Sequence, residues 1–155
     1  MSAKGFSLIE LVMVIVILGI LAVVAIPRFT GGTLYDARGF HDELMSATRY
    51  AQLQASTTGC LARIAISSGG YALDHENPCG SGDFGGLPVI HPSRGGAFQA
   101  NTPSGVTVSI SGQAELVFDG LGRPLTNNPP QVTVEGGGFS RSFCVEPETG
   151  HVEVC

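Results

Sequence analysis

The sequence has 155 residues, the usual size of one compact domain. It carries 8 basic and 13 acidic side chains, and this net charge of -5 argues against a general binder of nucleic acid backbones. Hydrophobic residues make up 43% of the chain and charged residues only 14%, a composition that excludes strong disorder. The mean hydropathy of +0.26 predicts that part of the chain lies in a membrane or a large apolar interface.

The first predicted element is an apolar segment of 16 residues from Leu11 to Ile26. A helix of this length measures roughly 24 Å and is shorter than the about 20 residues that span a bilayer. Counted from Phe6 the segment reaches 21 residues, but it then contains Glu10. A carboxylate at that depth is costly unless it is paired or neutralised, so Glu10 is a candidate functional group.

Three interpretations of this segment compete. A secretory signal peptide cut after Ala25 would release a periplasmic enzyme or binding module, whereas a permanent anchor would stay in the membrane. The stretch Gly5-Phe6-Ser7-Leu8-Ile9-Glu10 instead resembles the type IV prepilin signature, with glycine before the cleavage point, phenylalanine after it and glutamate at the fifth mature position. We favour the prepilin interpretation, because Pro27 also lies where these proteins have a helix-loosening proline and four features therefore agree.

The resemblance implies how the chain is divided and processed. Residues 1–5 would be a leader peptide, removed after Gly5 by a prepilin peptidase that then methylates the new N-terminus at Phe6. Residues 6–28 would form the transmembrane and filament-core helix, and residues 29–155 a periplasmic α+β head.

The charges at the new N-terminus suggest how subunits assemble. The positive Phe6 amine and the negative Glu10 carboxylate would both lie at the edge of hydrocarbon, where each charge strongly prefers an opposite partner. We therefore expect Glu10 to pair with the N-terminus of a neighbouring subunit. Gly19 weakens the helix and Pro27 removes one of its hydrogen bonds, so both permit the partial unwinding that this family undergoes in filaments.

A second helix is predicted over about residues 33–56, because apolar residues recur there at steps of three and four. These residues are Leu34, Ala37, Phe40, Leu44, Ala47, Ala51 and Ala55. The alanines make this face narrow and suited to close packing under a sheet, and Gly59 is expected to end the helix. His41 lies beside the apolar face, and we expect it to be exposed.

From Cys60 onward the apolar period changes to two, which predicts strands. A hairpin turns at Ser68-Gly69-Gly70, and residues 77–105 are expected to form a long loop. Further strands are predicted over residues 106–111, 114–118, 131–135, 139–145 and 151–155. One long helix followed only by strands implies an α+β fold with an antiparallel sheet laid on the helix, which is again the type IV pilin layout.

Later stretches of the sequence resemble particular pilins. Residues 116–124 resemble the F-x-x-x-G-R strand-turn of minor pilins of the GspH/FimT type, and residues 149–154 resemble their terminal hairpin, although His151 stands where arginine is frequent. Residues 14–22 resemble the anchor of pilins of the mannose-sensitive haemagglutinin pilus. We therefore expect a minor pilin of a type IV pilus that serves pilus biogenesis or adhesion, with an H-type pseudopilin of type II secretion as the alternative.

The resemblance also implies partners and location. The partners would be other pilin subunits, the prepilin peptidase/methyltransferase and an inner-membrane assembly platform, whereas the charge pattern speaks against nucleic acid. Before assembly the subunit would cross the bacterial inner membrane once, with its head in the periplasm. After assembly it would belong to an extracellular or periplasmic filament.

The four cysteines of an exported chain suggest disulfides, for which three connectivities exist. A two-residue turn at Thr149-Gly150 would place Cys144 opposite Cys155, and a three-residue turn would leave them diagonal but near. We favour Cys144–Cys155, which leaves Cys60–Cys79 by elimination.

The sequence contains none of the common catalytic motifs, so no enzyme, cofactor or metal centre is predicted. The cysteines lack the paired short spacings of zinc sites, and His75 and Cys79 lie in a loop beside Pro78 and Gly80. The loop carboxylates Asp74, Glu76 and Asp83 lack the spacing of a calcium loop, and we expect them to be solvated.

Overall fold

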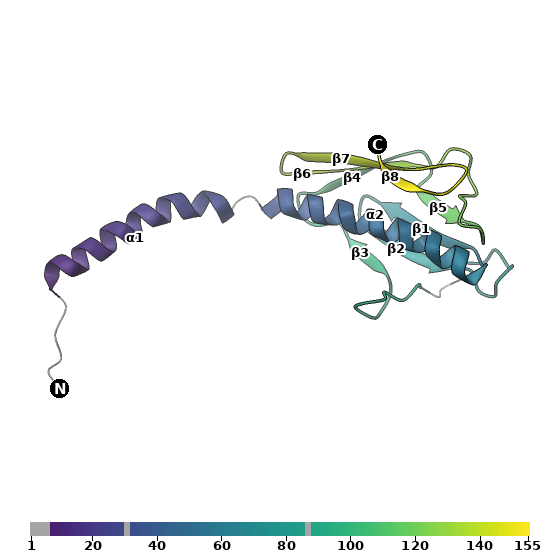
Figure 1. Ribbon diagram of the computed structural model, residues 1–155, viewed down its shortest axis with the longest axis horizontal. Coiled ribbons are helices and arrows are strands. Elements are labelled where there is room, and N and C mark those ends of the chain that lie inside the picture. The colour runs from purple at the N-terminus through teal and green to yellow at the C-terminus, as the bar shows by residue number, and fades with distance from the viewer. Residues whose placement is uncertain (1–6, 30–31, 86–87) are drawn as a thin grey trace, which may run out of the picture. The chain divides into compact units, whose positions relative to one another are not determined.

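The computed structural model describes residues 7–29, 32–85 and 88–155 (Figure 1). The chain divides into two compact units, Met1–Gly32 and Thr33–Cys155, which are described separately. Among the described residues, the first unit holds helix α1, and the second holds helix α2 (apart from its first residue) and all eight strands. The α+β class with a long helix packed on antiparallel strands is confirmed.

Helix α1, Leu8–Phe29, contains the apolar segment seen in the sequence and has 22 residues. It is continuous through Gly19 and Pro27. Its large apolar side chains are exposed as far as they are described, from 40% for Val12 to 81% for Leu8. None of the helices in the described ranges reaches the combined length and apolarity required to cross a membrane.

Helix α2, Gly32–Thr58, covers the predicted amphipathic segment. It ends at the expected glycine: Gly59 has a φ of 73° and donates its N–H to the Ala55 carbonyl oxygen at 2.9 Å. The buried side chains are Ala37, Phe40, His41, Leu44, Ala47, Thr48, Ala51 and Ala55. The buried face is therefore wider than the apolar pattern indicated, because it includes two polar residues.

The expectation that His41 is exposed is wrong, since only 1% of its surface is accessible. Its ring packs edge-on against Phe139 and Phe143, with centroid distances of 5.9 Å to each. Its Nδ1 atom lies 3.0 Å from a carboxylate oxygen of Asp42. A second sheet covers this side of the helix, and the helical pattern alone contains no sign of that sheet.

The strands form two antiparallel four-stranded sheets, where the sequence pattern indicated one. The first has the order β3-β2-β1-β5, with β1 Ala62–Ser67, β2 Gly70–His75, β3 Gln99–Asn101 and β5 Glu115–Phe118. The second has the order β4-β6-β7-β8, with β4 Thr107–Ser111, β6 Gln131–Gly136, β7 Phe139–Val145 and β8 Val152–Val154. The chain leaves the second sheet for the first between β4 and β5, where Gly112 has a φ of 104° that residues with side chains rarely adopt.

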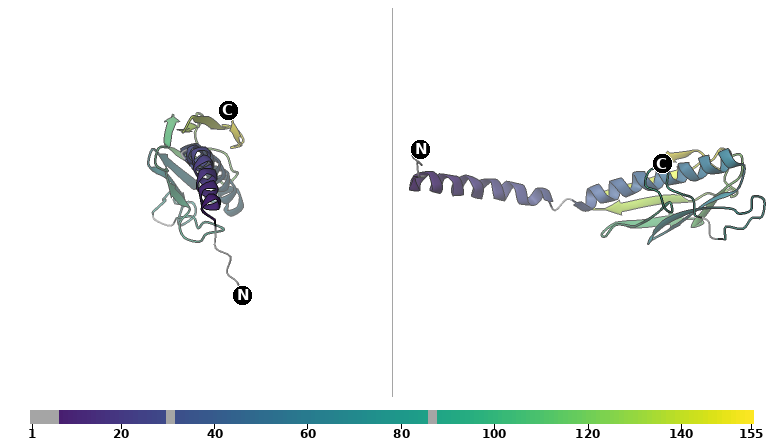
Figure 2. Two further views of the ribbon diagram at one scale, coloured as in Figure 1. Left: turned by 90° about the vertical axis from the view of Figure 1, so that its left-hand side faces the viewer. Right: turned by 90° about the horizontal axis from the view of Figure 1, so that it is seen from below.

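Helix α2 packs against both sheets, which share one hydrophobic core (Figure 2). Alanines on the helix let the strands approach closely, and aromatic side chains fill the remaining space. Phe118 from the first sheet and Phe143 from the second are both fully buried. The head therefore has one contiguous hydrophobic core, to which both sheets contribute.

The prediction that residues 77–105 form only a loop is wrong. Strand β3 lies within this segment and pairs with β2, with Gly70 opposite Asn101. Phe98 anchors the segment, because it is 6% exposed and its ring lies 5.3 Å from that of Tyr50 and 6.2 Å from that of Tyr71. Three residues are too few to show a strand periodicity, and only the free edge of β2 gives them a pairing partner.

The structure joins Cys60 to Cys79 and Cys144 to Cys155, the two pairings that the sequence favours. The register of the last hairpin differs from the expected one, because Cys144 lies opposite Glu153 and Cys155 is its diagonal neighbour. The Glu146 N–H donates to the His151 carbonyl oxygen at 2.8 Å, so four residues form the turn instead of two. The Cα atoms of Cys144 and Cys155 are nevertheless 5.8 Å apart, within the usual range for a disulfide.

Candidate functional site

The N-terminal end of α1 places Glu10 in the first helical turn. The Glu10 N–H donates to the carbonyl oxygen of Ser7 at 3.1 Å and to its hydroxyl oxygen at 3.3 Å, so Ser7 caps the helix. The partial positive charge of a helix N-terminus favours an anion there, and the Glu10 side chain is exposed. The sequence analysis missed the role of Ser7, although serine followed three residues later by glutamate is a capping signal.

The other predicted residues of the N-terminal segment are only partly described. Gly5 and Phe6, the predicted processing residues, lie outside the described residues. A Cβ atom on Gly19 would meet no heavy atom within 4 Å in this chain. The side chain of Pro27 lies outside the described residues too. The roles of all four stay predictions.

The two stretches that resemble minor pilins meet on helix α2. The Gln52 side chain donates through Nε2 to the Gly122 carbonyl oxygen at 3.1 Å and to the Thr149 carbonyl oxygen at 3.0 Å. The turns themselves touch, because a Cβ atom on Gly150 would lie 2.1 Å from the Gly122 oxygen. The two stretches are thus one structural feature, and the sequence analysis missed Gln52 because nothing along the chain links it to either turn.

Asp119 holds the first of these turns in shape. One carboxylate oxygen accepts the N–H groups of Leu121 and Arg123, each at 2.9 Å, and the other accepts the Arg123 guanidinium at 2.9 Å. Burial by itself raises the pKa of Asp119, but the backbone N–H and guanidinium of Arg123 and the Leu121 N–H lower it more. The net pKa is below the ordinary value of 3.8.

This carboxylate predicts a specific acid dependence of stability. A pKa that is lower in the folded than in the unfolded chain stabilises the fold above about pH 3.8, and the stabilisation is lost as the pH falls through the folded value. We expect Asp119→Asn to be less stable than wild type at pH 7 and the difference to shrink below pH 4. Urea unfolding at pH 7, 4 and 3 measures this, and a pH-independent difference would contradict it.

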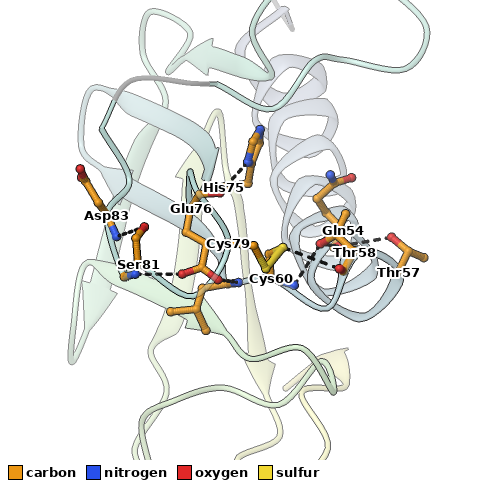
Figure 3. Close-up of a disulfide and its surroundings, with 11 residues drawn as sticks. Gln54, Thr57, Thr58, Cys60, His75, Glu76, Cys79, Ser81 and Asp83 are labelled. Carbon is orange, nitrogen blue, oxygen red and sulfur yellow. Dashed lines mark hydrogen bonds between the residues drawn. A yellow bond between two sulfur atoms is a disulfide. The ribbon is translucent and has the colours of Figure 1, made fainter.

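Glu76 lies beside the Cys60–Cys79 disulfide, at the junction between α2 and the first sheet (Figure 3). The expectation that it is solvated is wrong, since it is 4% exposed. Its carboxylate accepts the N–H groups of Leu61 at 2.8 Å and of Gly82 at 3.0 Å. Backbone N–H groups of Gly80, Leu61 and Gly82 hold the pKa of Glu76 below its ordinary value of 4.5.

This neighbourhood is also where the described residues bring potential metal ligands together. One ligand atom each of Cys60, Glu76 and Cys79 lies within 4.8 Å of the others. The two sulfur atoms are bonded to each other, so they are not thiolates and the cluster is a cross-link. Neither of the other two carboxylates expected in this loop belongs to the cluster: Asp74 lies in β2 and pairs with Arg63 at 2.8 Å, and Asp83 is exposed.

The N-terminal segment is similar to that of a known protein family. Residues 1–26 match the family model of the prokaryotic N-terminal methylation motif. The type IV major fimbrial protein FimA of Dichelobacter nodosus is 28% identical over 139 residues, which cover 81% of this chain and 82% of that protein. The type IV narrow pilus major component PilA5 of Thermus thermophilus is 49% identical over 51 residues, a match to 33% of this chain and 44% of that protein.

The fold of this chain is similar to that of a solved pilin structure. The type IV minor pilin FimU of Pseudomonas aeruginosa superposes with a TM-score of 0.57 at 14% identity, over 78% of this chain and 89% of that one. A second crystal form of FimU gives a TM-score of 0.54 over 76% and 91% of the two chains. The methylation motif, the similarity to fimbrial proteins and the shared fold together make this chain similar to the type IV pilins, which are structural subunits and not enzymes.

Proposed function

We propose that this chain is a minor pilin of a type IV pilus, serving pilus biogenesis or adhesion. The observation that carries the proposal is the motif at the start of α1, where Gly5 and Phe6 are followed by Glu10 in the first helical turn. The fold of FimU, which is named as a minor pilin, supports the minor subtype, as do the two turns that meet at Gln52.

In this proposal the three parts of the chain act in sequence. Residues 1–5 are the leader, which a prepilin peptidase/methyltransferase removes before it methylates Phe6. Residues 6–28 hold the subunit in the inner membrane and later pack in the filament core, and residues 29–155 form the head. An inner-membrane assembly platform moves the subunit from the membrane into an extracellular or periplasmic filament.

Glu10 supplies the pairing step. Its carboxylate attracts the positive N-terminus of a neighbouring subunit, because a charge at the edge of hydrocarbon has lost much of its hydration and interacts strongly with an opposite charge in the low dielectric there. The capped helix start fixes the position of Glu10 relative to the helix axis. The pairing therefore sets the register between neighbouring subunits, while Gly19 and Pro27 let the helix unwind in the filament.

The N-terminus of the exported protein tests the proposal directly. Mass spectrometry of the subunit from sheared filaments is expected to find a chain that begins at an N-methylated Phe6. The Gly5→Val variant places a branched side chain before the cleavage point. We expect this variant to remain uncleaved and to begin at Met1. A chain that begins at Ile26 would mean a signal peptide and would refute the proposal.

The rival within the same class is an H-type pseudopilin of type II secretion, because the GspH/FimT-type turn at residues 116–124 occurs in both systems. Deletion of the gene separates the two. Loss of surface filaments, with the subunit present in trace amounts in wild-type filaments, supports the minor pilin. Normal filaments with failed protein secretion support the pseudopilin, and a copy number close to that of the main subunit refutes the minor assignment.

A further inference from the structure

The two chain segments that carry Cys60 and Cys79 converge on the carboxylate of Glu76 (Figure 3). One oxygen accepts the N–H of Leu61, the residue that follows Cys60, at 2.8 Å. The other accepts the N–H of Gly82, three residues after Cys79, at 3.0 Å. The same buried side chain therefore binds the backbone on both sides of the cross-link.

The conformation of the Cys79 loop is adapted to this carboxylate. Gly80 and Gly82 have φ values of 82° and 69°, a left-handed conformation that turns backbone N–H groups toward one concave side. Such a concavity binds anions, and here the anion belongs to the chain itself. The Glu76 backbone contributes as well, since its N–H donates to the Leu61 carbonyl oxygen at 2.9 Å.

We propose that Glu76 is a positioning residue for the oxidation of Cys60 and Cys79. The carboxylate holds both segments in their final places before the sulfur atoms are joined, so the ordering that the cross-link requires is already present in the dithiol form. In the reaction the two thiols lose two protons and two electrons and form the S–S bond. A disulfide of glutathione class takes up the electrons and becomes two thiols.

The equilibrium of this reaction reports the positioning effect more cleanly than its rate does. The Glu76 carboxylate lies within 4.8 Å of both sulfur atoms. Its negative charge disfavours a nearby thiolate and thereby slows thiol–disulfide exchange. Neutral dithiol and disulfide, by contrast, both lack charge, so their ratio reflects how well the two thiols are held together.

Glutathione redox buffers at pH 7 measure that ratio on the full-length chain in detergent. After alkylation, peptide mapping quantifies the Cys60–Cys79 and Cys144–Cys155 bonds separately, so the second disulfide is an internal control. Glu76→Gln replaces an acceptor oxygen with an NH2 group that faces a backbone donor. We expect it to lower the equilibrium constant for Cys60–Cys79 about tenfold or more, the size of one lost charge-assisted hydrogen bond, and to leave Cys144–Cys155 unchanged.

Two further variants complete the test. Glu148→Gln removes an exposed carboxylate in the chain segment that the Cys144–Cys155 disulfide closes, and it should change neither equilibrium. Glu76→Asp keeps the charge on a shorter side chain and should recover part of the loss. An unchanged Cys60–Cys79 equilibrium in Glu76→Gln overturns the proposal. An equal fall of both disulfides also overturns it, because Glu76 would then act only through the stability of the whole head.

Discussion

A Glu10→Val subunit will reach the membrane as the wild-type subunit does, but its incorporation into filaments will fall about tenfold or more. Removal of a charge from an apolar helix favours membrane insertion. The neighbouring Phe6 amine, however, would lose its partner at the edge of hydrocarbon, and loss of one member of such a pair costs several kcal/mol. Quantitative immunoblots of membrane fractions and sheared filaments measure the two effects separately.

Glu10→Asp is the matched control, because it keeps the negative charge and shortens the side chain by one methylene. We expect this variant to be incorporated better than the valine variant. Wild-type incorporation of Glu10→Val would show that the proposed pairing is wrong. It would leave the pilin-like fold and family untouched, since neither depends on that contact.

Gly150→Ala is expected to lower the stability of the head by about 3 kcal/mol. The added Cβ atom would lie 2.1 Å from the Gly122 carbonyl oxygen and 2.8 Å from Nε2 of Gln52. The φ of Gly150 is also 73°, a conformation that alanine adopts only with strain. Backbone atoms cannot move aside as a flexible side chain does, so the two turns must separate.

Gly59→Ala is the control for this variant, because Gly59 has the same φ of 73° but a Cβ atom added there would meet no heavy atom within 4 Å. We expect Gly59→Ala to cost about 1 kcal/mol, the strain alone. Thermal unfolding in detergent measures both effects, and we expect the Tm to decrease by roughly 10 °C in Gly150→Ala. Equal decreases for the two variants would mean that the contact between the turns contributes nothing.

Sequence patterns were sufficient to predict those elements of the protein that depend on neighbouring residues. The period of three and four residues identified α2, because one face of a helix must be apolar to pack. The apolar period of two residues likewise predicted strands, and glycines predicted the turns between them. The N-terminal motif is also local, since the proposed cleavage and methylation, like the position of Glu10, would depend only on neighbouring residues. The class of protein was therefore predictable from about thirty residues.

Which elements cover one another could not be predicted in this way, because it depends on contacts between residues far apart in the chain. His41 is buried because a second sheet lies over that side of α2, and β3 forms because the edge of β2 is free to pair. Gln52 joins two turns that are far apart in the sequence. Glu76, expected in water, is buried where the residues after two distant cysteines meet. In each case the partner is distant along the chain, so its effect exists only after the chain has folded.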